Sequence, residues 1–415
     1  MAVTFTKQPA YVTPSDNPVE FVFRQPLLVG GAPKYNISFV VEVFLSGGSI
    51  GKFEVYSEAQ DSTYVYGKVD VSNIASPFVP TQNLKPSTAV TVYNPIGYSF
   101  IYITVSEKYS TVIDATPTIV STATSEDIAL FKGKLSRSEF LNWDYTKYQK
   151  AVNKQLLTDR SYTLVGGVIN VYTDTIKKED SYSFSWFDNT YGQTKIDYKV
   201  LYVYSDSSNA TITTYEETNL TGNQGLMGAI YFNLANHVSL GYLTSGQASN
   251  CVKVLIGISN TSGVSILPLT VLNFDTTCFF NGATLKFMNK FGAYDSYLFT
   301  YNKRYSANVK AFEFERSQGV WNGTTYSQSN TNTGRLTYLK QTTKKLELSS
   351  DWLDETTQNW LTQMYDSPAV YINEGEENES VTITNSSYQI KQDKHDELFN
   401  EIVEIEFTPE NSIRI

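Results

Sequence analysis

The sequence predicts a mainly β, multi-domain protein: Ig-like β-sandwich domains followed by a C-terminal antiparallel sheet with one packed helix. Three observations support this fold class. At 415 residues, the chain is long enough for roughly two to four domains. Short segments of alternating apolar and polar residues recur along it, separated by glycine or polar turns. Helical patterns are scarce, and the clearest one lies near the C-terminus.

Residues 35–56 show the strand pattern best. Apolar residues alternate with polar ones over the first half, Gly47 and Gly48 interrupt the pattern, and a second alternating run follows. Two alternating runs around a glycine turn predict a β-hairpin. The same pattern at 198–215 and 252–272 predicts two further hairpins, and repeated hairpins at this spacing are typical of sandwiches or barrels.

Two shifts in composition indicate domain boundaries. Residues 114–125 are small and polar with one proline, which is typical of a linker. A second shift falls near Asn281 and Gly282. We therefore expect a β-sandwich domain at 1–125, a second β-sandwich domain at 126–280 and a C-terminal β domain at 281–415.

The C-terminal domain carries the predicted helix, at about residues 354–366. Asp354 has the residue type and position of an N-cap, and Pro368 ends the helical pattern. The apolar face consists of Trp360, Leu361, Met364 and Tyr365. Strands are expected around this helix, at 345–348, 369–372, 381–383, 388–390 and 402–407. A second, short helix is predicted from the capping-box spacing of Ser136 and Glu139.

Composition and charge exclude some classes of function. Charged residues make up 18% of the chain, below the roughly 25% of an average domain. The net charge is −10 and no Lys/Arg cluster occurs, so nucleic-acid binding is not expected as the main role. No signal peptide or long apolar run is present, so we expect synthesis in the cytoplasm and no membrane partner. Thirty tyrosines suit strands and protein interfaces.

Residues with catalytic or metal-binding chemistry are few. The only two histidines, His237 and His395, are interpreted as structural, and no nucleophile turn accompanies them. The cysteines, Cys251 and Cys278, lack metal or redox spacing and are read as core residues. A glycine motif at 222–228 lacks the Lys-Ser/Thr and the βαβ pattern of a phosphate loop.

Three patterns leave a functional alternative open. The glutamates at 374–379 suit either a calcium site or, better, a solvated hairpin tip. The aromatic run at 285–299 suits either a ligand platform or, better, two core strands around a glycine turn. Two carboxylates brought together by folding would suffice for a glycosidase. From the sequence we predict no catalytic, cofactor-binding or metal-binding residues, no cofactor and no enzymatic activity.

Several segments of this chain resemble tail-associated virion proteins of Bacteroidetes phages, including crAss-like phages. The resemblance is strongest after residue 280 and covers about a third of the chain. The segments that carry it are Lys7–Ala10, Ser15–Val19, Leu285–Phe299 with its Asn-Lys-Phe-Gly-Ala-Tyr-Asp-Ser core, Asp351–Glu355, Trp360–Leu361, Ser367–Ile372 and Asn385–Ile390.

The resemblance implies a structural tail component, such as a ring, collar, hub or baseplate protein, located in the phage virion. It also implies a homo-oligomeric ring that contacts other tail or neck proteins. The C-terminal order of strand, helix and strands is similar to the tail-tube and distal-tail fold. Two alternatives stay open: a carbohydrate- or receptor-binding tail module, for which the Trp321–Tyr326 loop is the candidate, and a polysaccharide depolymerase.

Overall fold

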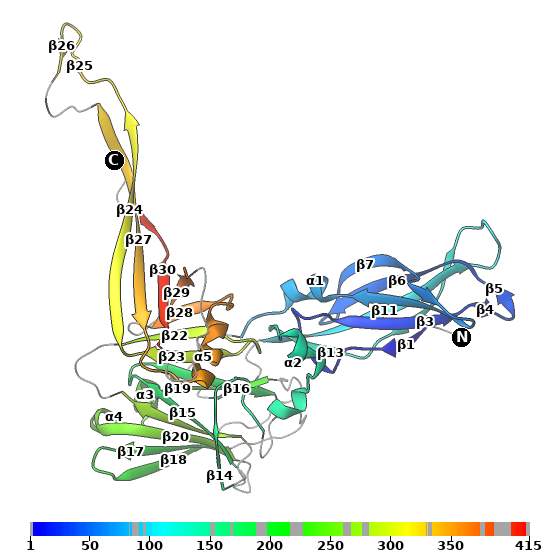
Figure 1. The fold of residues 1–415 in the computed structure, drawn as a ribbon, viewed down its shortest axis with the longest axis horizontal. Helices are drawn as coiled ribbons and strands as arrows, with labels where there is room; N and C mark the ends of the chain where they lie inside the picture. The colour runs from blue at the N-terminus through cyan, green and yellow to red at the C-terminus, as the bar shows by residue number, and fades with distance from the viewer. Residues whose placement is uncertain are drawn as a thin grey trace. The chain divides into compact units, whose positions relative to one another are not determined.

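The computed structural model describes residues 3–82, 84, 91–93, 97–149, 154–166, 169–187, 197–215, 227–259, 267–275, 282–328, 330, 334–373, 378–385 and 400–411. Strands dominate these residues, and the helices among them are short. The chain is therefore mainly β and is built from several sheets, as predicted (Figure 1).

The described chain forms two compact units, each assembled from separate stretches. Unit 1 consists of Met1–Asp174, Ser181–Phe274 and Met288–Asp295. Unit 2 consists of Thr175–Asp180, Asp275–Phe287 and Ser296–Ile415. The boundaries expected at residues 125 and 280 stay predictions.

The first part of unit 1 is a β-sandwich. One sheet contains β2 (Val12–Pro14), β13 (Ile128–Phe131), β11 (Tyr98–Ser110), β6 (Tyr35–Leu45) and β7 (Gly48–Tyr56) in that order, with β12 (Thr118–Thr124) also paired to β11. The other contains β1 (Thr4–Lys7), β3 (Glu20–Pro26), β9 (Tyr64–Asp70) and β8 (Ala59–Gln60). Smaller elements are β4 (Leu28–Val29), β5 (Ala32–Pro33), α1 (Ser72–Ala75) and the 3-10 turn η1 (Ser76–Phe78).

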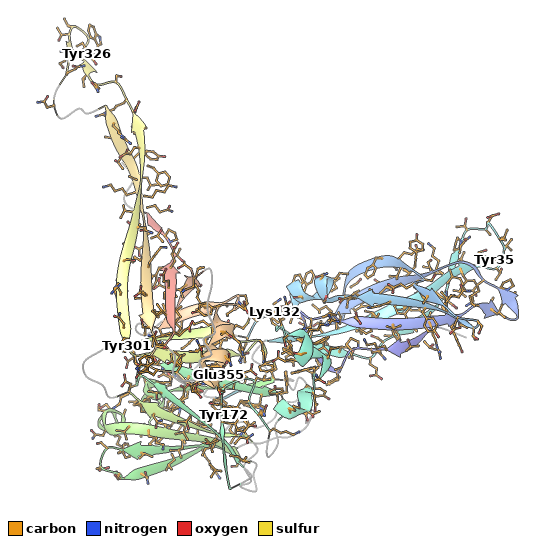
Figure 2. All side chains as sticks on the ribbon, in the orientation of Figure 1. Tyr35, Lys132, Tyr172, Tyr301, Tyr326 and Glu355 are labelled. Atoms are coloured by element: carbon orange, nitrogen blue, oxygen red, sulfur yellow. The ribbon has the colours of Figure 1, made fainter. Side chains whose placement is uncertain are left out.

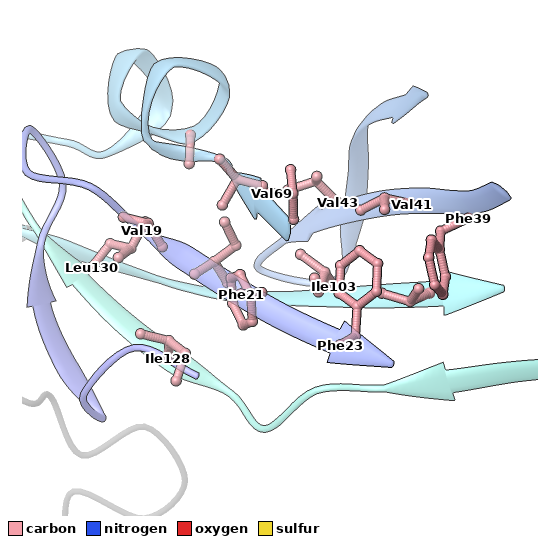
Figure 3. Packing of buried hydrophobic residues seen from close by; sticks show 14 of the residues in the cluster. Val19, Phe21, Phe23, Phe39, Val41, Val43, Val69, Ile103, Ile128 and Leu130 are labelled. Atoms are coloured by element: carbon pink, nitrogen blue, oxygen red, sulfur yellow. The ribbon is translucent and has the colours of Figure 1, made fainter. Parts of the chain in front are cut away.

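Alternation places the apolar side chains of both sheets in the space between them. Phe21 and Phe23 of β3 pack with Phe39 and Val41 of β6 (Figure 3). The predicted hairpin at 35–56 is confirmed as β6 and β7, which pair from Ser38↔Tyr56 to Leu45↔Gly48. This cluster is the core of the sandwich because the polar partners in each strand face outward.

The predicted linker at 114–125 is wrong. Thr118–Thr124 form β12, which pairs antiparallel with Thr104–Tyr109 of β11. The residues after Pro117 are mostly Thr, Val and Ile, and β-branched side chains favour an extended strand. That preference, together with the open edge of β11, outweighs the small, polar composition that suggested a linker.

The rest of unit 1 holds two more sheets. The six-stranded one runs β14 (Thr163–Val165), β15 (Ile169–Ile176), β21 (Leu269–Phe274), β20 (Cys251–Ser259), β17 (Asp197–Tyr204) and β18 (Asn209–Tyr215). The three-stranded one runs β10 (Thr91–Tyr93), β19 (Met227–Asn233) and β16 (Ser181–Phe187). The helices are α2 (Arg137–Leu141), α3 (Leu234–Ser239) and α4 (Ser245–Asn250), with the 3-10 turn η2 (Tyr145–Tyr148).

Two sequence predictions fall in this part of unit 1. The hairpin at 198–215 is confirmed as β17 and β18. The strands of the 252–272 hairpin are confirmed as β20 and β21, which pair antiparallel, whereas residues 260–266 between them lie outside the described residues. The capping box at Ser136 and Glu139 is also confirmed, because each side chain bonds the other's backbone N–H.

Unit 2 is one large sheet with a helix on it. Its order is β23 (Tyr294–Phe299), β22 (Ala283–Met288), β28 (Val370–Asn373), β29 (Asn378–Ile383), β30 (Ile402–Phe407), β27 (Arg335–Ser349) and β24 (Asn302–Glu315), with β31 (Glu410–Asn411) on β27. A separate pair, β25 (Val320–Trp321) and β26 (Tyr326–Ser327), follows β24. The helix is α5 (Glu355–Leu361), continued by the 3-10 turn η3 (Thr362–Met364).

The predicted C-terminal helix is confirmed, in a form shorter than expected. Asp354 accepts a hydrogen bond from the Thr357 N–H at 3.1 Å, as an N-cap does. Trp360, Leu361 and Met364 are buried in one core with the strands of the sheet. The expected strand at 388–390 lies outside the described residues, and the other four are present.

The aromatic run at 285–299 forms β22 and β23, joined by a tight turn, as the core-strand reading predicted. The Asn289 side-chain oxygen accepts the N–H groups of Phe291 and Ala293 at 3.0 and 3.2 Å. Gly292 has φ +72°, and a Cβ there would stand 1.7 Å from the carbonyl oxygen of Lys132. Only glycine fits this approach, so the turn is held closely against the backbone at Lys132.

Candidate assembly interface

A long two-stranded hairpin is the most distinctive feature of unit 2. Strands β24 and β27 pair antiparallel from Asn302↔Ser349 to Glu315↔Arg335. Near its base, β30 pairs with Lys345–Ser349 of β27, and further out β31 pairs only with Gln341 and Thr342. The outer part runs past the other strands of the sheet (Figure 1). A two-stranded hairpin alone has marginal stability in water, so the outer part lacks the support that its base has.

One face of this hairpin continues the buried face of the sheet. Leu346 of β27 is fully buried in the core of unit 2, and its direct partner across the hairpin is Tyr305. Directly paired residues share a face, and so do residues two apart on one strand. Tyr305, Ala307, Val309 and Ala311 therefore form one row, which we call the outer stripe.

The outer stripe is exposed. Tyr305 keeps 55% of its surface accessible and Val309 keeps 61%. Further along, Phe312 and Phe314 approach Tyr338 with ring centroids 6.4 and 6.1 Å apart. Figure 2 shows side chains standing off both sides of the hairpin. The partners of Ala307, Val309 and Ala311 on β27 share this face and are Lys344, Thr342 and Lys340. An exposed apolar row with polar side chains beside it is typical of an interaction site.

The end of the hairpin is an ordered tip, Gly319–Ser327. Trp321 and Tyr326 are direct partners in the β25/β26 pair, so their rings lie on one face. The Asn322 side-chain oxygen accepts the N–H groups of Thr324 and Thr325 at 2.9 and 2.8 Å, which closes the turn. The segment expected to be the Trp321–Tyr326 loop is thus a small hairpin.

The aromatic side chains of the tip are exposed to solvent, and Figure 2 shows Tyr326 there. Trp321 is 64% exposed and Tyr326 is 53% exposed. A Cβ on Gly319 would stand 2.1 Å from the Tyr326 ring, so this ring lies directly against the glycine backbone. No charged residue occurs from Ser317 to Gly334. Uncharged and aromatic, the tip has the composition of an interface anchor.

His237, one of the two predicted structural histidines, is buried among aromatic rings. The Tyr202 hydroxyl hydrogen-bonds its Nδ1, and the rings of Tyr198, Phe232 and Tyr242 lie 5.0 to 6.2 Å away. Burial lowers the pKa of His237 to about 4. A neutral, enclosed imidazole has no route to a substrate, which fits the structural interpretation. His395 lies outside the described residues.

The other candidate sites lie largely outside the described residues. Cys251 is buried, and Gly228 belongs to β19, where a Cβ would stand 2.3 Å from the Trp186 ring. Cys278, most of the 222–228 glycine motif and the glutamates at 374–377 lie outside the described residues. Within those residues, no group of three or more His, Cys, Asp or Glu side chains is placed to hold a metal ion.

Folding brings the carboxylates of Glu139, Asp144 and Asp159 to one cavity of about 320 Å³ in unit 1. Lys290 bridges two of them, with its Nζ 2.5 Å from Glu139 Oε1 and also paired to Asp159. Burial raises the pKa of Glu139, but hydrogen bonds from Lys290 and Ser136 bring it below its ordinary value. Glu139 therefore stays ionised at neutral pH, which argues against a role as the general acid of a glycosidase.

Three aromatic rings line the same cavity, which we call the ring pocket. Trp143, Tyr148 and Phe291 have ring centroids 4.9 to 6.1 Å apart. The Trp143 indole N–H donates to the carbonyl oxygen of Val12 at 2.7 Å, which fixes its orientation. The sequence does not indicate this pocket, because its residues come from α2, η2, the segment near Asp159 and the turn after β22.

Comparisons with known proteins leave family and function open. No protein-family model matches the chain, and no curated protein matches it. Among solved structures, the crystal structure of squid arrestin is similar over 66% of this chain and 94% of the arrestin chain, at 9% identity and a TM-score of 0.18. A likeness this weak carries no argument. Within the described ranges, no helix combines the length and apolar character needed to cross a membrane.

Proposed function

We propose that this chain is a non-enzymatic structural component of a bacteriophage tail that acts through protein–protein contacts in a symmetric ring. The observation that carries the assembly role is the outer stripe of the β24/β27 hairpin, where apolar side chains of a core face stand in water. The assignment to a phage tail, as a ring, collar, hub or baseplate protein beside other tail or neck proteins, rests on the sequence resemblance.

Covering the outer stripe would release substantial free energy. Fully burying a Val-sized or Phe-sized side chain contributes roughly 1.5–3 kcal/mol. Tyr305 and Val309 each expose more than half of their surface, so a neighbour that covers both gains a contribution comparable to a hot spot. The same neighbour would support a hairpin that is marginal by itself.

The strand edge of the hairpin supports the same role. Among the described residues, strand β24 is the last strand of its sheet, so its outer edge is a place where a partner strand can add. Lys303, Arg304 and Lys310 lie along it, and charges on an edge discourage indiscriminate pairing. An open edge with charged side chains suits a specific partner strand better than random aggregation.

The test is self-association of the purified chain. We expect light scattering and electron microscopy to show one oligomer of fixed symmetry, and expect the double variant Tyr305→Ser/Val309→Ser to shift it towards monomer. Tyr56→Ser is the matched control, because Tyr56 is 73% exposed on β7 in unit 1. A wild-type chain that stays monomeric at every concentration tested, alone and in virion extracts, would contradict the proposal.

A carbohydrate- or receptor-binding module is the second candidate. The exposed Trp321 and Tyr326 rings favour it, since aromatic faces stack on sugar rings. A glycan array distinguishes the two functions: binding that Trp321→Ala abolishes, without any self-association, would favour this candidate. A depolymerase has less support because two of the three carboxylates in the ring pocket, Glu139 and Asp159, are ion-paired to Lys290.

A further inference from the structure

The ring pocket offers an apolar wall that is already formed. Trp143 packs against Tyr148 and Phe291, and its N–H bond to Val12 holds the ring in place. The Phe291 backbone N–H donates to the side-chain oxygen of Asn289, which holds this residue in the turn after β22. At about 320 Å³, the cavity is at the small end of ligand pockets, which span about 300–1,000 Å³. It therefore suits one ring-sized group rather than an extended ligand.

The charges of the pocket select an uncharged occupant. Three carboxylates (Glu139, Asp144 and Asp159) and two lysines (Lys147 and Lys290) line the pocket. Lys290 already pairs with both Glu139 and Asp159. A charged guest would compete with these pairs, and a charge buried without a partner is costly. An uncharged ring that carries an N–H or O–H donor avoids this cost, and it can donate to the carboxylate oxygens at the rim.

The tip of the hairpin has these properties. It is uncharged from Ser317 to Gly334, and it presents Trp321 at 64% exposure. The Trp321 indole N–H donates to no acceptor within the described residues. Trp321 therefore carries an apolar ring, an unused donor and no charge, on a backbone ordered by Asn322.

We propose that Trp321 at the tip of one copy of this chain inserts into the ring pocket of a second copy. This inference rests on the proposed function, because it names the partner of the hairpin. Tip and pocket are different surfaces of the chain, so the contact is heterologous. Repeating a heterologous contact from copy to copy builds a closed ring or an open filament.

The test uses two variants that each disable one half of the contact. Trp321→Ala removes the inserting ring and keeps the pocket. Ser138→Trp places a large side chain at the pocket rim, from an exposed position on α2, and keeps the tip. The matched control is Leu141→Trp, on the same helix and 74% exposed. Circular dichroism checks that each variant is folded.

Alone, each of the two variants should associate about 30-fold more weakly than wild type, the loss expected of a hot-spot residue. Mixed in equal amounts, they should form a heterodimer that does not grow further, because each copy keeps one working half. Native mass spectrometry with one variant isotope-labelled identifies this species. Leu141→Trp should assemble like wild type.

Other results would overturn the inference. If wild type assembles but the mixture yields no heterodimer, the tip does not enter the pocket, although the assembly role survives. If either variant assembles as wild type does, the same conclusion follows. If a saccharide binds wild type, fails to bind Ser138→Trp, and no heterodimer forms, the pocket has a glycan as its occupant instead. A wild type that never self-associates contradicts the proposed function itself, which is a separate result.

Discussion

Two long antiparallel pairs in this protein, β6/β11 and β24/β27, have the same local structure and opposite surroundings. β11 has 13 residues and β24 has 14. In β11 every second residue is buried along its length, whereas the outer part of β24 is exposed on both faces. Backbone hydrogen bonding is continuous in both pairs apart from local register shifts. The difference lies in what covers them.

The β6/β11 pair is covered within its own sandwich, because β3 and β9 supply Phe21, Phe23 and Val69 to the shared core. At the base of β24/β27, α5 does the same through Trp360 and Leu361. The outer stripe has no such cover among the described residues. A long strand pair without a second layer is therefore expected to depend on a partner chain, as the proposed function requires.

The largest difference is expected when a phenylalanine is truncated to alanine in each of the two strand pairs. Phe39→Ala on β6 removes a fully buried ring whose centroid lies 4.8 Å from that of the Phe23 ring. We expect it to lower the unfolding free energy by about 3–5 kcal/mol. Phe314→Ala on β24, where the ring is 44% exposed, should cost about 0.5 kcal/mol or less. Hydrogen exchange of the amides in each pair measures both values, and similar losses would erase the distinction.

The sandwich contains a buried ion pair, whereas the hairpin carries an exposed one. Lys34 Nζ lies 2.8 Å from Glu107 Oε2, with both side chains almost fully buried. Glu107→Gln leaves a buried ammonium group without its charge partner and should destabilise the sandwich by about 3 kcal/mol. Glu410→Gln breaks the Lys344–Glu410 pair on the hairpin, where both side chains are more than half exposed.

The Glu410→Gln change should be within about 0.5 kcal/mol of wild type. Urea unfolding of both variants provides the measurement. A large loss for Glu410→Gln would indicate that the hairpin is covered in the isolated chain, contrary to the comparison.

Burial should also make stability depend on pH. The pKa of buried His237 is about 4, whereas an imidazole in the unfolded chain titrates near 6.5. Between these values the unfolded chain binds more protons, so the unfolding free energy falls as pH drops from about 6.5 to 4. The loss is about 2–3 kcal/mol. In His237→Gln this part of the pH dependence should vanish, and an unchanged slope would refute the assignment.

The smallest effect concerns the helix that covers the base of β24/β27. Asp354→Ala removes the acceptor for the Thr357 N–H and should lower the unfolding free energy by about 1 kcal/mol. Asp354→Asn is the control, because an amide oxygen still caps the helix and should keep most of the stability. Equal losses in both variants would mean that the charge, rather than the cap, matters here.

Local patterns account for much of what could be predicted. The hairpin at 35–56, the capping box at Ser136 and Glu139, and the cap at Asp354 are all read from residues a few positions apart. The linker prediction at 114–125 is wrong because the structure of that segment depends on a strand outside it. An open edge on β11 gave that segment a partner that its own composition does not reveal.

The type of most elements and the absence of charge around the tip therefore follow from the sequence alone, since periodicity and composition are local properties. Which faces are covered depends on the tertiary structure. The outer stripe lies on the same face as Leu346. Alternation of apolar and polar residues does not reveal that Leu346 is buried whereas its partner Tyr305 is exposed. The ring pocket joins Trp143, Asp159 and Phe291, and contacts between segments this far apart depend on how the sheets pack.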